Sequence, residues 1–331
     1  MKICIVGGTG NISSSIVKLL IELGHEVTLF GRGKTGAAPP EVKVIHGDRK
    51  DSAAFETALQ SSHFDAAIDM ICYNAEDARS TIRAFRGVKH LVYCSTVCTY
   101  GVNYDWLPVT EDHPSRPTTD YGRNKLEADR VFMAAHYDDG FPVTILKPST
   151  TFGPSWSMLR QIAWEASWVD RVRKGKPIVV CGDGRALHQW LYVDDAAPAF
   201  VFTLGRERCL GQTYHVMKQE FGTWADYHRT AMKVIGREVE LIGVPLSSLL
   251  AAGVPNVGIC ESIFSHNTVY SPEKLMRDVP EFKPRISLEE GLSFVLEAME
   301  RDKRVPDSDL EDWEDRLIAA QRAVGELKLG K

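Results

Sequence analysis

Two side chains spaced four positions apart could act together on a proton. They begin and end the segment Tyr121-Gly122-Arg123-Asn124-Lys125, and helical spacing would place both on one face. A positive charge beside a phenol favours the phenolate and lowers the pKa of the phenol from about 10 toward the physiological range. A tyrosine tuned in this way can exchange a proton with a substrate hydroxyl group.

A further hydroxyl group is expected close to this pair. The apolar run His90–Cys94 predicts a strand, and Ser95 and Thr96 follow it directly. Parallel α/β sheets bind their ligands at the carboxyl ends of their strands. We therefore expect the Thr96 hydroxyl group to hydrogen-bond the substrate oxygen on which Tyr121 acts.

A glycine-rich turn near the N-terminus predicts a dinucleotide site. It follows an apolar run that predicts the first strand, and it precedes a helical pattern. Gly7 permits the tight turn and Gly10 lets the backbone approach a pyrophosphate at the helix N-terminus, while Ser13 takes the place of a third glycine. The residues expected to contact the cofactor here are Gly7, Thr9, Gly10, Asn11 and Ile12.

The end of the second predicted strand indicates which dinucleotide binds. An NAD-selective fold usually carries an acidic residue there, whereas this chain has Gly31 followed by Arg32. A guanidinium group suits a 2′-phosphate, so NADP(H) is favoured over NAD(H), with Lys34 as a second cation. After the third predicted strand, Asp48 and Arg49 are further candidates for contact with the adenosine end.

Alternating short β-branched runs and helical patterns in the first half predict βαβ units around a parallel sheet. The expected fold is a Rossmann-type, doubly wound α/β sheet with a smaller C-terminal substrate-binding domain. Strands are expected at Lys2–Val6, Glu26–Phe30, Val42–His46, Ala66–Asp69, His90–Cys94 and Val143–Leu146. Helices are expected at Ile12–Leu23, Ser52–Gln60, Glu76–Phe85, Tyr121–His136, Arg160–Arg173, Trp224–Ile235 and within Asp307–Lys331, the last a solvated amphipathic helix.

The alternation weakens from Pro154 onward, which indicates a second domain. Residues 1–155 are assigned to the dinucleotide-binding domain, and residues 156–177 and 205–331 to the substrate-binding domain. The segment Ile178–Leu204 has the pattern of strand, loop, strand and helix, and we expect it to return to the first domain.

Four motifs together resemble the extended short-chain dehydrogenase/reductase superfamily, in its NAD-dependent epimerase/dehydratase group. They are Gly7–Ser13, Tyr93–Gly101, Tyr121–Lys125, and Leu146–Pro148 leading to Phe152–Pro154. The resemblance implies Tyr121 as general acid/base, Lys125 as its electrostatic partner and ribose ligand, and Thr96 in the serine/threonine role. It also implies a homodimer through the helix that begins at Tyr121, and further cofactor contacts from Met70, Ile71, Cys72, Pro148 and Thr150.

The chain departs from the pattern of family members that act on nucleotide-diphosphate sugars. Those proteins often carry an arginine and an aspartate where this chain has His188 and Gln189. The resemblance therefore favours a smaller sugar, sugar acid or related compound over a nucleotide sugar. Tryptophans could stack on a sugar ring, although Trp164 and Trp168 fit an amphipathic-helix core equally well. The expected substrate contacts are Thr96, Trp156, Arg185, His188 and Trp190.

Composition argues against several classes of partner. The 331-residue chain has a formal net charge of −5 and lacks the basic surface that nucleic-acid binding usually requires. No apolar run is long enough to span a membrane. The seven cysteines form no Cys-x-x-Cys pair, and the histidines show no metal-ligand spacing. We expect a cytoplasmic protein with reduced thiols, and with no metal, nucleic-acid or membrane partner.

These observations favour an oxidoreductase that transfers hydride at a carbinol or carbonyl carbon of a carbohydrate-like molecule. One alternative is an epimerase that works by transient oxidation. Dehydration is disfavoured because Val97 stands where family dehydratases place an acid. A second alternative is a non-catalytic dinucleotide-sensing or RNA-associated protein, which would be expected to have lost the Tyr121–Lys125 pair.

Overall fold

The computed structural model describes residues 1–34, 36–163 and 165–327. The chain forms two compact units, each assembled from three segments. The first comprises Met1–Thr151, Trp190–Gln219 and Tyr270–Arg285; the second comprises Phe152–Gln189, Glu220–Val269 and the chain from Ile286 onward. The boundaries differ from the expected ones: residues 178–189 group with the second unit, because their strand pairs there, and Tyr270–Arg285 group with the first.

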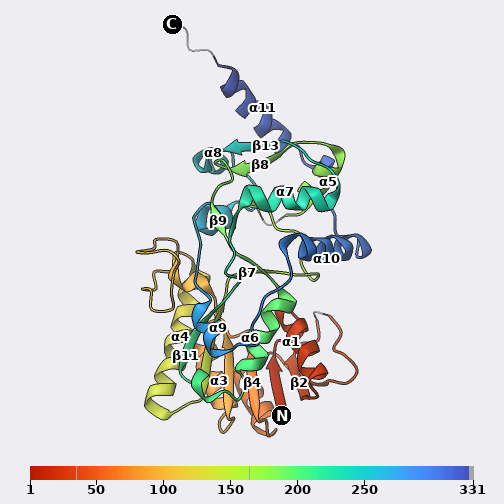
Figure 1. Ribbon diagram of the computed structural model, residues 1–331. Helices are drawn as coiled ribbons and strands as arrows, with labels where there is room; N and C mark the ends of the chain where they lie inside the picture. The colour runs from red at the N-terminus through yellow and green to blue at the C-terminus, as the bar shows by residue number, and fades with distance from the viewer. Residues whose placement is uncertain (35, 164, 328–331) are drawn as a thin grey trace. The chain divides into compact units, whose positions relative to one another are not determined.

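A seven-stranded parallel sheet forms the centre of the first unit, in the order β11-β6-β5-β4-β1-β2-β3 (Figure 1). This arrangement confirms the predicted doubly wound α/β fold, with β11 as one strand more than the sequence suggested. The strands are β1 (Lys2–Val6), β2 (Glu26–Gly31), β3 (Lys43–His46), β4 (Ala66–Asp69), β5 (His90–Cys94), β6 (Val143–Pro148) and β11 (Gln212–Val216).

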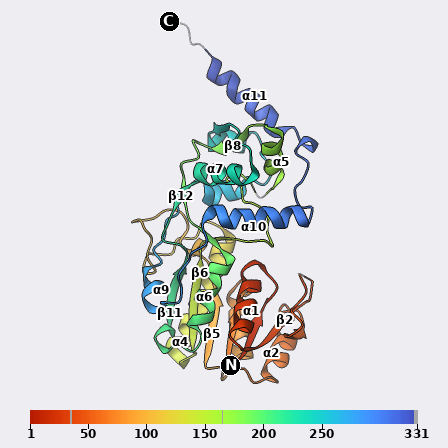
Figure 2. The same cartoon turned by 45° about the vertical axis from the view of Figure 1, so that its right-hand side comes forward.

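Helices cover both faces of this sheet (Figures 1 and 2). On one face α1 (Asn11–Glu22) and α6 (Val193–Thr203) share an apolar core with the strands. On the other face the core includes α2 (Ser52–Gln60), α3 (Ala75–Ala84) and α4 (Asp120–Asp139). Shorter elements of this unit are η1 (Val97–Tyr100), β10 (Trp190–Tyr192), η2 (Glu207–Cys209) and α9 (Glu273–Asp278), and β7 (Thr150–Phe152) begins in it.

Strand register brings the carboxyl ends of the central strands to one edge. Val6 pairs with Asp69, Asp69 with Tyr93, and Cys94 with Leu146. The residues that follow β1, β4 and β5 therefore emerge side by side. This edge is where parallel α/β sheets bind their ligands.

The second unit contains two small two-stranded sheets and several helices. β8 (Ile178–Cys181) pairs in parallel with β13 (Leu241–Val244), and β9 (Leu187–His188) pairs antiparallel with β12 (Gly222–Thr223). The helices are α5 (Ser167–Lys174), α7 (Trp224–Ile235), α8 (Leu246–Ala251), η3 (Cys260–Phe264), α10 (Leu288–Arg301), η4 (Ser308–Leu310) and α11 (Trp313–Glu326). The range expected for the helix at Trp224–Ile235 agrees with α7.

The helix expected at Arg160–Arg173 is shorter than the sequence suggested, because α5 begins only at Ser167. Glu165 holds the preceding loop: its carboxylate pairs with Arg160 and accepts a hydrogen bond from the Ser167 backbone N–H, at 2.7 Å. Arg160 is also paired with Glu314 of α11, in the core of this unit. Trp168 is a core residue, which agrees with the prediction of an amphipathic-helix core and not with sugar stacking. Trp164 lies outside the described residues.

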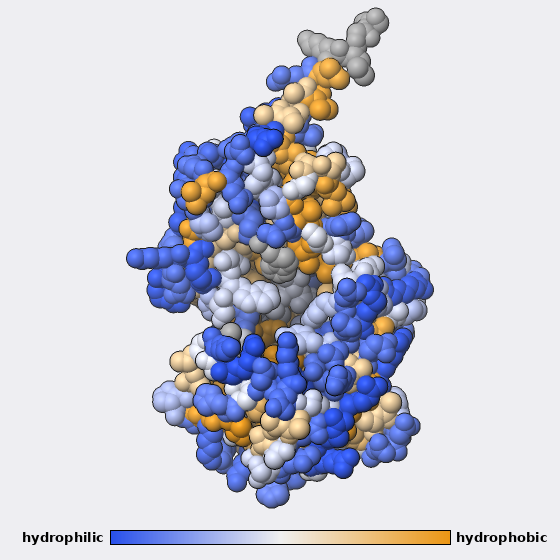
Figure 3. Space-filling model, turned by 180° about the vertical axis from the view of Figure 1, so that it is seen from behind, coloured by the Kyte–Doolittle hydropathy of each residue, from blue (hydrophilic) through white to orange (hydrophobic). Residues whose placement is uncertain are grey.

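Hydrophilic side chains cover much of the surface (Figure 3). Hydrophobic residues are exposed along the end of α11, where Val324 and Leu327 are among them, and residues 328–331 lie outside the described part of the chain. Within the described ranges, no helix combines the length and the apolar character needed to span a membrane.

Candidate active site

The turn after β1 has the shape of a cradle that only glycine can form. Gly7 has φ +86°, and a Cβ atom there would lie 2.6 Å from Ile71. A Cβ atom on Gly8 would lie 2.4 Å from the Leu29 side chain. At Gly10 the backbone N–H donates to the Ser13 hydroxyl group at 2.8 Å, so the serine in place of a third glycine stabilises the turn.

A buried amide side chain completes this turn. Asn11 is the first residue of α1 and is 8% exposed, and both polar atoms of its side chain lack a hydrogen-bond partner among the described residues. An unpartnered buried amide is costly unless a ligand satisfies it. The neighbouring Thr9 and Ile12 are half-buried. Together with the free N–H groups of a helix N-terminus, this cradle fits the pyrophosphate of a dinucleotide.

The residues expected at the adenosine end separate into two groups. Arg32 and Asp48 are exposed at neighbouring strand ends, where their charged atoms lie 3.9 Å apart, and Lys34 is also exposed. Arg49 is different, because its guanidinium group is buried in an ion pair with Asp69 and also donates to Thr81. The interpretation of the Arg49 side chain as a cofactor ligand is therefore corrected, because this side chain stabilises the fold through its buried partners.

Lys125 lies on α4 beneath the carboxyl edge of the sheet, where it is 1% exposed. Its ammonium group donates to the backbone carbonyl of Cys94, at 2.6 Å, and to that of Cys72, at 2.8 Å. These carbonyls belong to the end of β5 and to the segment after β4, so Lys125 joins three elements of the site. Cys94 itself is buried, as expected, whereas Cys98 is half-buried.

Tyr121 lies close to Thr96, whose side chain acts on the phenol group. Two features bring them together: Thr119 caps α4 by accepting from the Gly122 N–H at 3.0 Å, and Gly122 packs so closely that a Cβ atom there would lie 2.4 Å from the Cys98 carbonyl oxygen. The structure thus brings Thr96, Tyr121 and Lys125 to one place.

The expected depression of the Tyr121 pKa is not found. Burial raises the pKa of Tyr121 above its usual value of 10, and the nearby Thr96 side chain opposes this rise only in part. The Lys125 ammonium group does not reverse the rise: it is bound to backbone carbonyls, and its nitrogen lies 6.0 Å from the centroid of the Tyr121 ring. In this arrangement the phenol keeps its proton at neutral pH.

The other expected cofactor residues line the same edge. Met70 and Ile71 follow β4 and are half-buried, while Cys72 is buried and offers its carbonyl to Lys125. Pro148 is the buried last residue of β6, and Thr150 is the half-buried first residue of β7.

A buried polar network that sequence reasoning missed supports the catalytic strand. Ser95 donates to Asp129 of α4 at 2.6 Å, and Lys147 of β6 pairs with the same carboxylate at 2.8 Å. Lys147 also donates to Thr99 at 2.8 Å. The signal was a lysine inside an apolar strand, which must find a partner when it is buried.

The expected substrate residues outside the catalytic group have different environments. In the second unit, Arg185 is exposed beside Asp183, whereas His188 is buried against Trp224 and Phe264 and accepts or donates a 2.7 Å hydrogen bond with Thr268. Burial lowers the pKa of His188 to about 3. The interpretation of His188 as a substrate contact is corrected: it is a neutral core residue. In the first unit, Trp190 is buried on β10.

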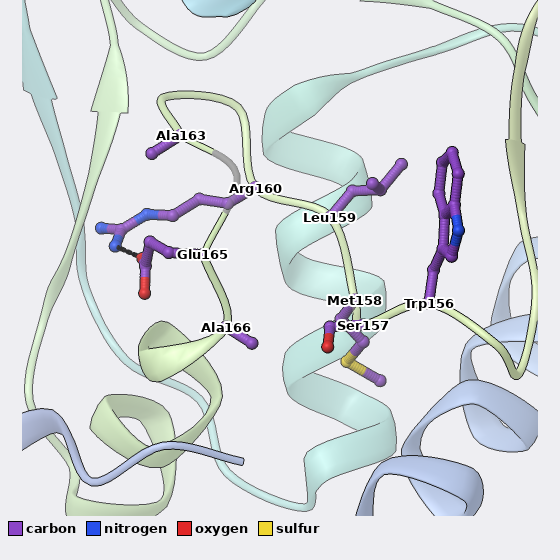
Figure 4. Close-up of a pocket in the computed structure, with 8 residues that line it drawn as sticks. All are labelled: Trp156, Ser157, Met158, Leu159, Arg160, Ala163, Glu165 and Ala166. Carbon is purple, nitrogen blue, oxygen red and sulfur yellow. Dashed lines mark hydrogen bonds and ion pairs between the residues drawn. The ribbon is translucent and has the colours of Figure 1, made fainter. Parts of the chain in front are cut away.

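Trp156 borders a pocket of the second unit with a volume of about 240 Å³ (Figure 4). Its lining is Trp156, Ser157, Met158, Leu159, Arg160, Ala163, Glu165 and Ala166. In Figure 4 the Trp156 ring lies apart from the Arg160–Glu165 ion pair. Trp156 is 44% exposed, so its ring remains available for stacking.

Two carboxylates in the first turn of α6 bind neighbouring segments. Asp194 accepts a 2.6 Å hydrogen bond from Ser15 of α1, and Asp195 accepts one from the Arg285 backbone N–H at 2.9 Å. They lie within the first turn of α6 and tie it to neighbouring segments.

Comparison with known proteins decides the family. A family model described as the NAD dependent epimerase/dehydratase family matches residues 3–216. The chain belongs to this family. It is 28% identical to 2'-dehydrokanamycin reductase of Streptomyces kanamyceticus, over 74% of this chain and 70% of that protein. It is also 28% identical to chloroplast stem-loop binding protein of 41 kDa b of Arabidopsis thaliana, over 71% of this chain and 63% of that protein.

Solved epimerases share the fold of this NAD-dependent epimerase/dehydratase family member. A UDP-glucose 4-epimerase from Thermotoga maritima, solved with UDP-glucose, has a TM-score of 0.74 at 19% identity and covers 92% of this chain and 100% of that chain. A UDP-glucose 4-epimerase from Thermus thermophilus, solved with NAD, has a TM-score of 0.73 at 22% identity. The match covers 91% of this chain and 99% of that chain. Other curated relatives are named a UDP-glucose 4-epimerase and a dTDP-glucose 4,6-dehydratase, and the matching family is described as NAD dependent.

Proposed function

We propose that this protein is an NADP(H)-dependent oxidoreductase, with NAD(H) as the alternative, that transfers hydride at a carbinol or carbonyl carbon of a small carbohydrate-like substrate. The observation that carries the proposal is that Thr96, Tyr121 and the buried Lys125 lie together, with the Lys125 ammonium nitrogen 6.0 Å from the centroid of the Tyr121 ring. This arrangement offers two hydroxyl groups to a single substrate oxygen at the ligand-binding edge of the sheet.

The nicotinamide ring, when bound, supplies the hydride donor or acceptor. The Tyr121 hydroxyl group would move a proton to or from the substrate oxygen, and Thr96 would hold that oxygen by a hydrogen bond. A tyrosine phenol carries its proton at neutral pH, so Tyr121 could give this proton to a carbonyl oxygen in the reductive direction. One relative of the chain is named a reductase.

The cofactor preference rests on charge at the end of β2. Arg32 and Lys34 are exposed cations where an NAD-selective site usually has a carboxylate, and they suit a 2′-phosphate. Asp48 lies close enough to Arg32 to orient it. The pyrophosphate would bind over Gly7 to Asn11.

The substrate class follows from the family and from the residues that this chain lacks. Relatives named for a dehydrokanamycin and for UDP-glucose favour a carbohydrate-like molecule. The buried His188 offers no cationic clamp for a diphosphate, which favours a smaller sugar or sugar derivative over a nucleotide sugar. Trp156 is 44% exposed, and aromatic rings of this kind stack on sugars.

The test is steady-state kinetics of the purified protein with NADPH and NADH against a panel of keto sugars and sugar alcohols. Net oxidation of the cofactor supports the proposal. Interconversion of stereoisomers without net cofactor change would support the epimerase alternative, which the many related epimerases favour. Cofactor binding with no turnover across the panel, or binding of stem-loop RNA, would favour the sensing or RNA-associated alternative.

A further inference from the structure

Lys125 carries a buried charge that no carboxylate neutralises in the described part of the chain. Its ammonium group has two backbone carbonyl acceptors and is 1% exposed. A buried ammonium group without a carboxylate partner needs other groups of negative potential around it.

Aromatic rings surround the ammonium group. Its nitrogen lies 4.9 Å from the ring centroid of Tyr93, 5.1 Å from that of Tyr73 and 6.0 Å from that of Tyr121. Cations are attracted to the faces of aromatic rings at such distances, and the attraction is stronger away from water. The rings and the carbonyls together provide the negative potential that a carboxylate would otherwise supply.

Tyr73 is the member of this group whose role is not explained by the core or by proton transfer. Tyr93 is fully buried on β5, and Tyr121 is assigned to the chemistry, whereas Tyr73 is 48% exposed at the carboxyl edge after β4. The backbone holds it firmly, because its N–H donates to Asp77 at 2.8 Å and the next residue, Asn74, caps α3. The preceding residue, Cys72, gives its carbonyl to Lys125.

We propose that Tyr73 is a positioning residue of the active site, whose ring face holds the Lys125 ammonium group in place. This inference deepens the proposed function and rests on it for its catalytic consequence. The ring acts through its face, so the phenolic oxygen of Tyr73 is not needed. A phenylalanine should therefore serve at this position, and an aliphatic residue should not.

The first experiment requires neither cofactor nor substrate. The Lys125 amine is labelled with an amine-reactive reagent at several pH values, and the rate is followed by peptide mass spectrometry in wild type, Tyr73→Phe and Tyr73→Leu. Loss of the ring should release the amine from its place, so Tyr73→Leu should be labelled about 3- to 30-fold faster, while Tyr73→Phe stays close to wild type. Tyr137→Leu, which removes an exposed tyrosine elsewhere on α4, is the matched control and should leave the rate unchanged.

The second experiment measures NADPH binding and turnover. In Tyr73→Leu both should weaken, because the Lys125 ammonium group is no longer held in place, and Tyr73→Phe should restore the wild-type values. Equal labelling of Tyr73→Leu and wild type would overturn the inference, as would equal impairment of the Leu and Phe variants. If wild type bound no dinucleotide, the proposed function would fail, while the labelling rates would still decide the role of Tyr73.

Discussion

Arg49 donates two hydrogen bonds to the Asp69 carboxylate, from its Nη1 atom at 3.0 and 2.8 Å, and both side chains are buried. The same carboxylate accepts from Thr81 of α3 at 2.7 Å and from the Ile71 backbone N–H at 3.1 Å. Asp69 is the last residue of β4, so this network fixes the segment that follows the strand. Residues 70–72 owe their position at the edge of the sheet to an ion pair beneath it.

Removal of one partner should therefore destabilise the protein strongly. Arg49→Leu would leave the Asp69 carboxylate buried without its counter-charge, and we expect a loss of about 3–5 kcal/mol in the free energy of unfolding. Lys43→Ala, which breaks the exposed pair with Glu26, is the control and should cost about 1 kcal/mol or less. Urea unfolding measures the loss of unfolding free energy in both variants. A similar small loss for the two variants would contradict the structural role of Arg49.

Tyr121→Phe should abolish most turnover while the protein still binds its cofactor. The variant removes the hydroxyl group proposed to move the proton, and a positioned acid/base typically contributes about 10²–10⁴-fold to the rate. Initial rates and NADPH titration by fluorescence would be measured in parallel. A rate close to that of wild type would exclude Tyr121 from the chemistry.

Much of the fold could be predicted from local pattern alone. Alternation of apolar runs and helical periods located six strands and the helices between them, since a buried parallel strand must be a short apolar run. β11 was missed because it is separated from β6 in sequence by the second unit's first segment, and its pairing with β6 is a long-range contact. The helix before Ser167 was overpredicted because the ion pairs of Arg160 override local propensity.

The site shows the same division between local and long-range information. Tyr121, Lys125 and Thr96 were found because their spacing and their place after a strand are visible in the sequence. Sequence could not show that Lys125 is bound by the carbonyls of Cys72 and Cys94, since backbone acceptors carry no residue signature. It also could not show the partners of Arg49, which lie 20 and more residues further along the chain.

Arg32→Ala should weaken NADP(H) binding far more than NAD(H) binding. Hydrogen bonds to a charged group are worth about 1.5–3 kcal/mol, which corresponds to roughly a 10- to 100-fold loss of affinity for the phosphorylated cofactor only. Fluorescence titration with both cofactors gives the ratio of the two losses of affinity. Equal losses for the two would contradict the assignment of the 2′-phosphate to Arg32.

The helix that begins beside Tyr121 should form the face of a homodimer, as the family resemblance suggests. α4 carries Tyr137, which is 75% exposed on the single chain, and a large exposed aromatic residue is typical of a contact surface. Light scattering should give twice the mass of one chain, and Tyr137→Lys should shift the equilibrium toward monomer. A monomeric wild type at assay concentrations would contradict this proposal.

Four buried histidines should make the protein unstable in mild acid. Burial lowers the pKa of His90 to about 4 and those of His188, His215 and His228 to about 3. Because the unfolded state takes up these protons near pH 6.5, stability is complete above that pH and falls as the pH drops toward the folded-state values. Each histidine should cost about 1.4 kcal/mol of unfolding free energy at about pH 5.5 relative to neutral pH.

His188→Gln isolates one of these contributions. The variant should lose stability through the buried site itself, but its further loss between about pH 7.5 and about pH 5.5 should be smaller than that of wild type by about 1.4 kcal/mol. His63→Gln changes an exposed histidine and should keep the wild-type pH dependence. Urea unfolding at the two pH values measures all three proteins, and an identical fall for His188→Gln and wild type would show that His188 titrates normally and is not buried in the neutral form.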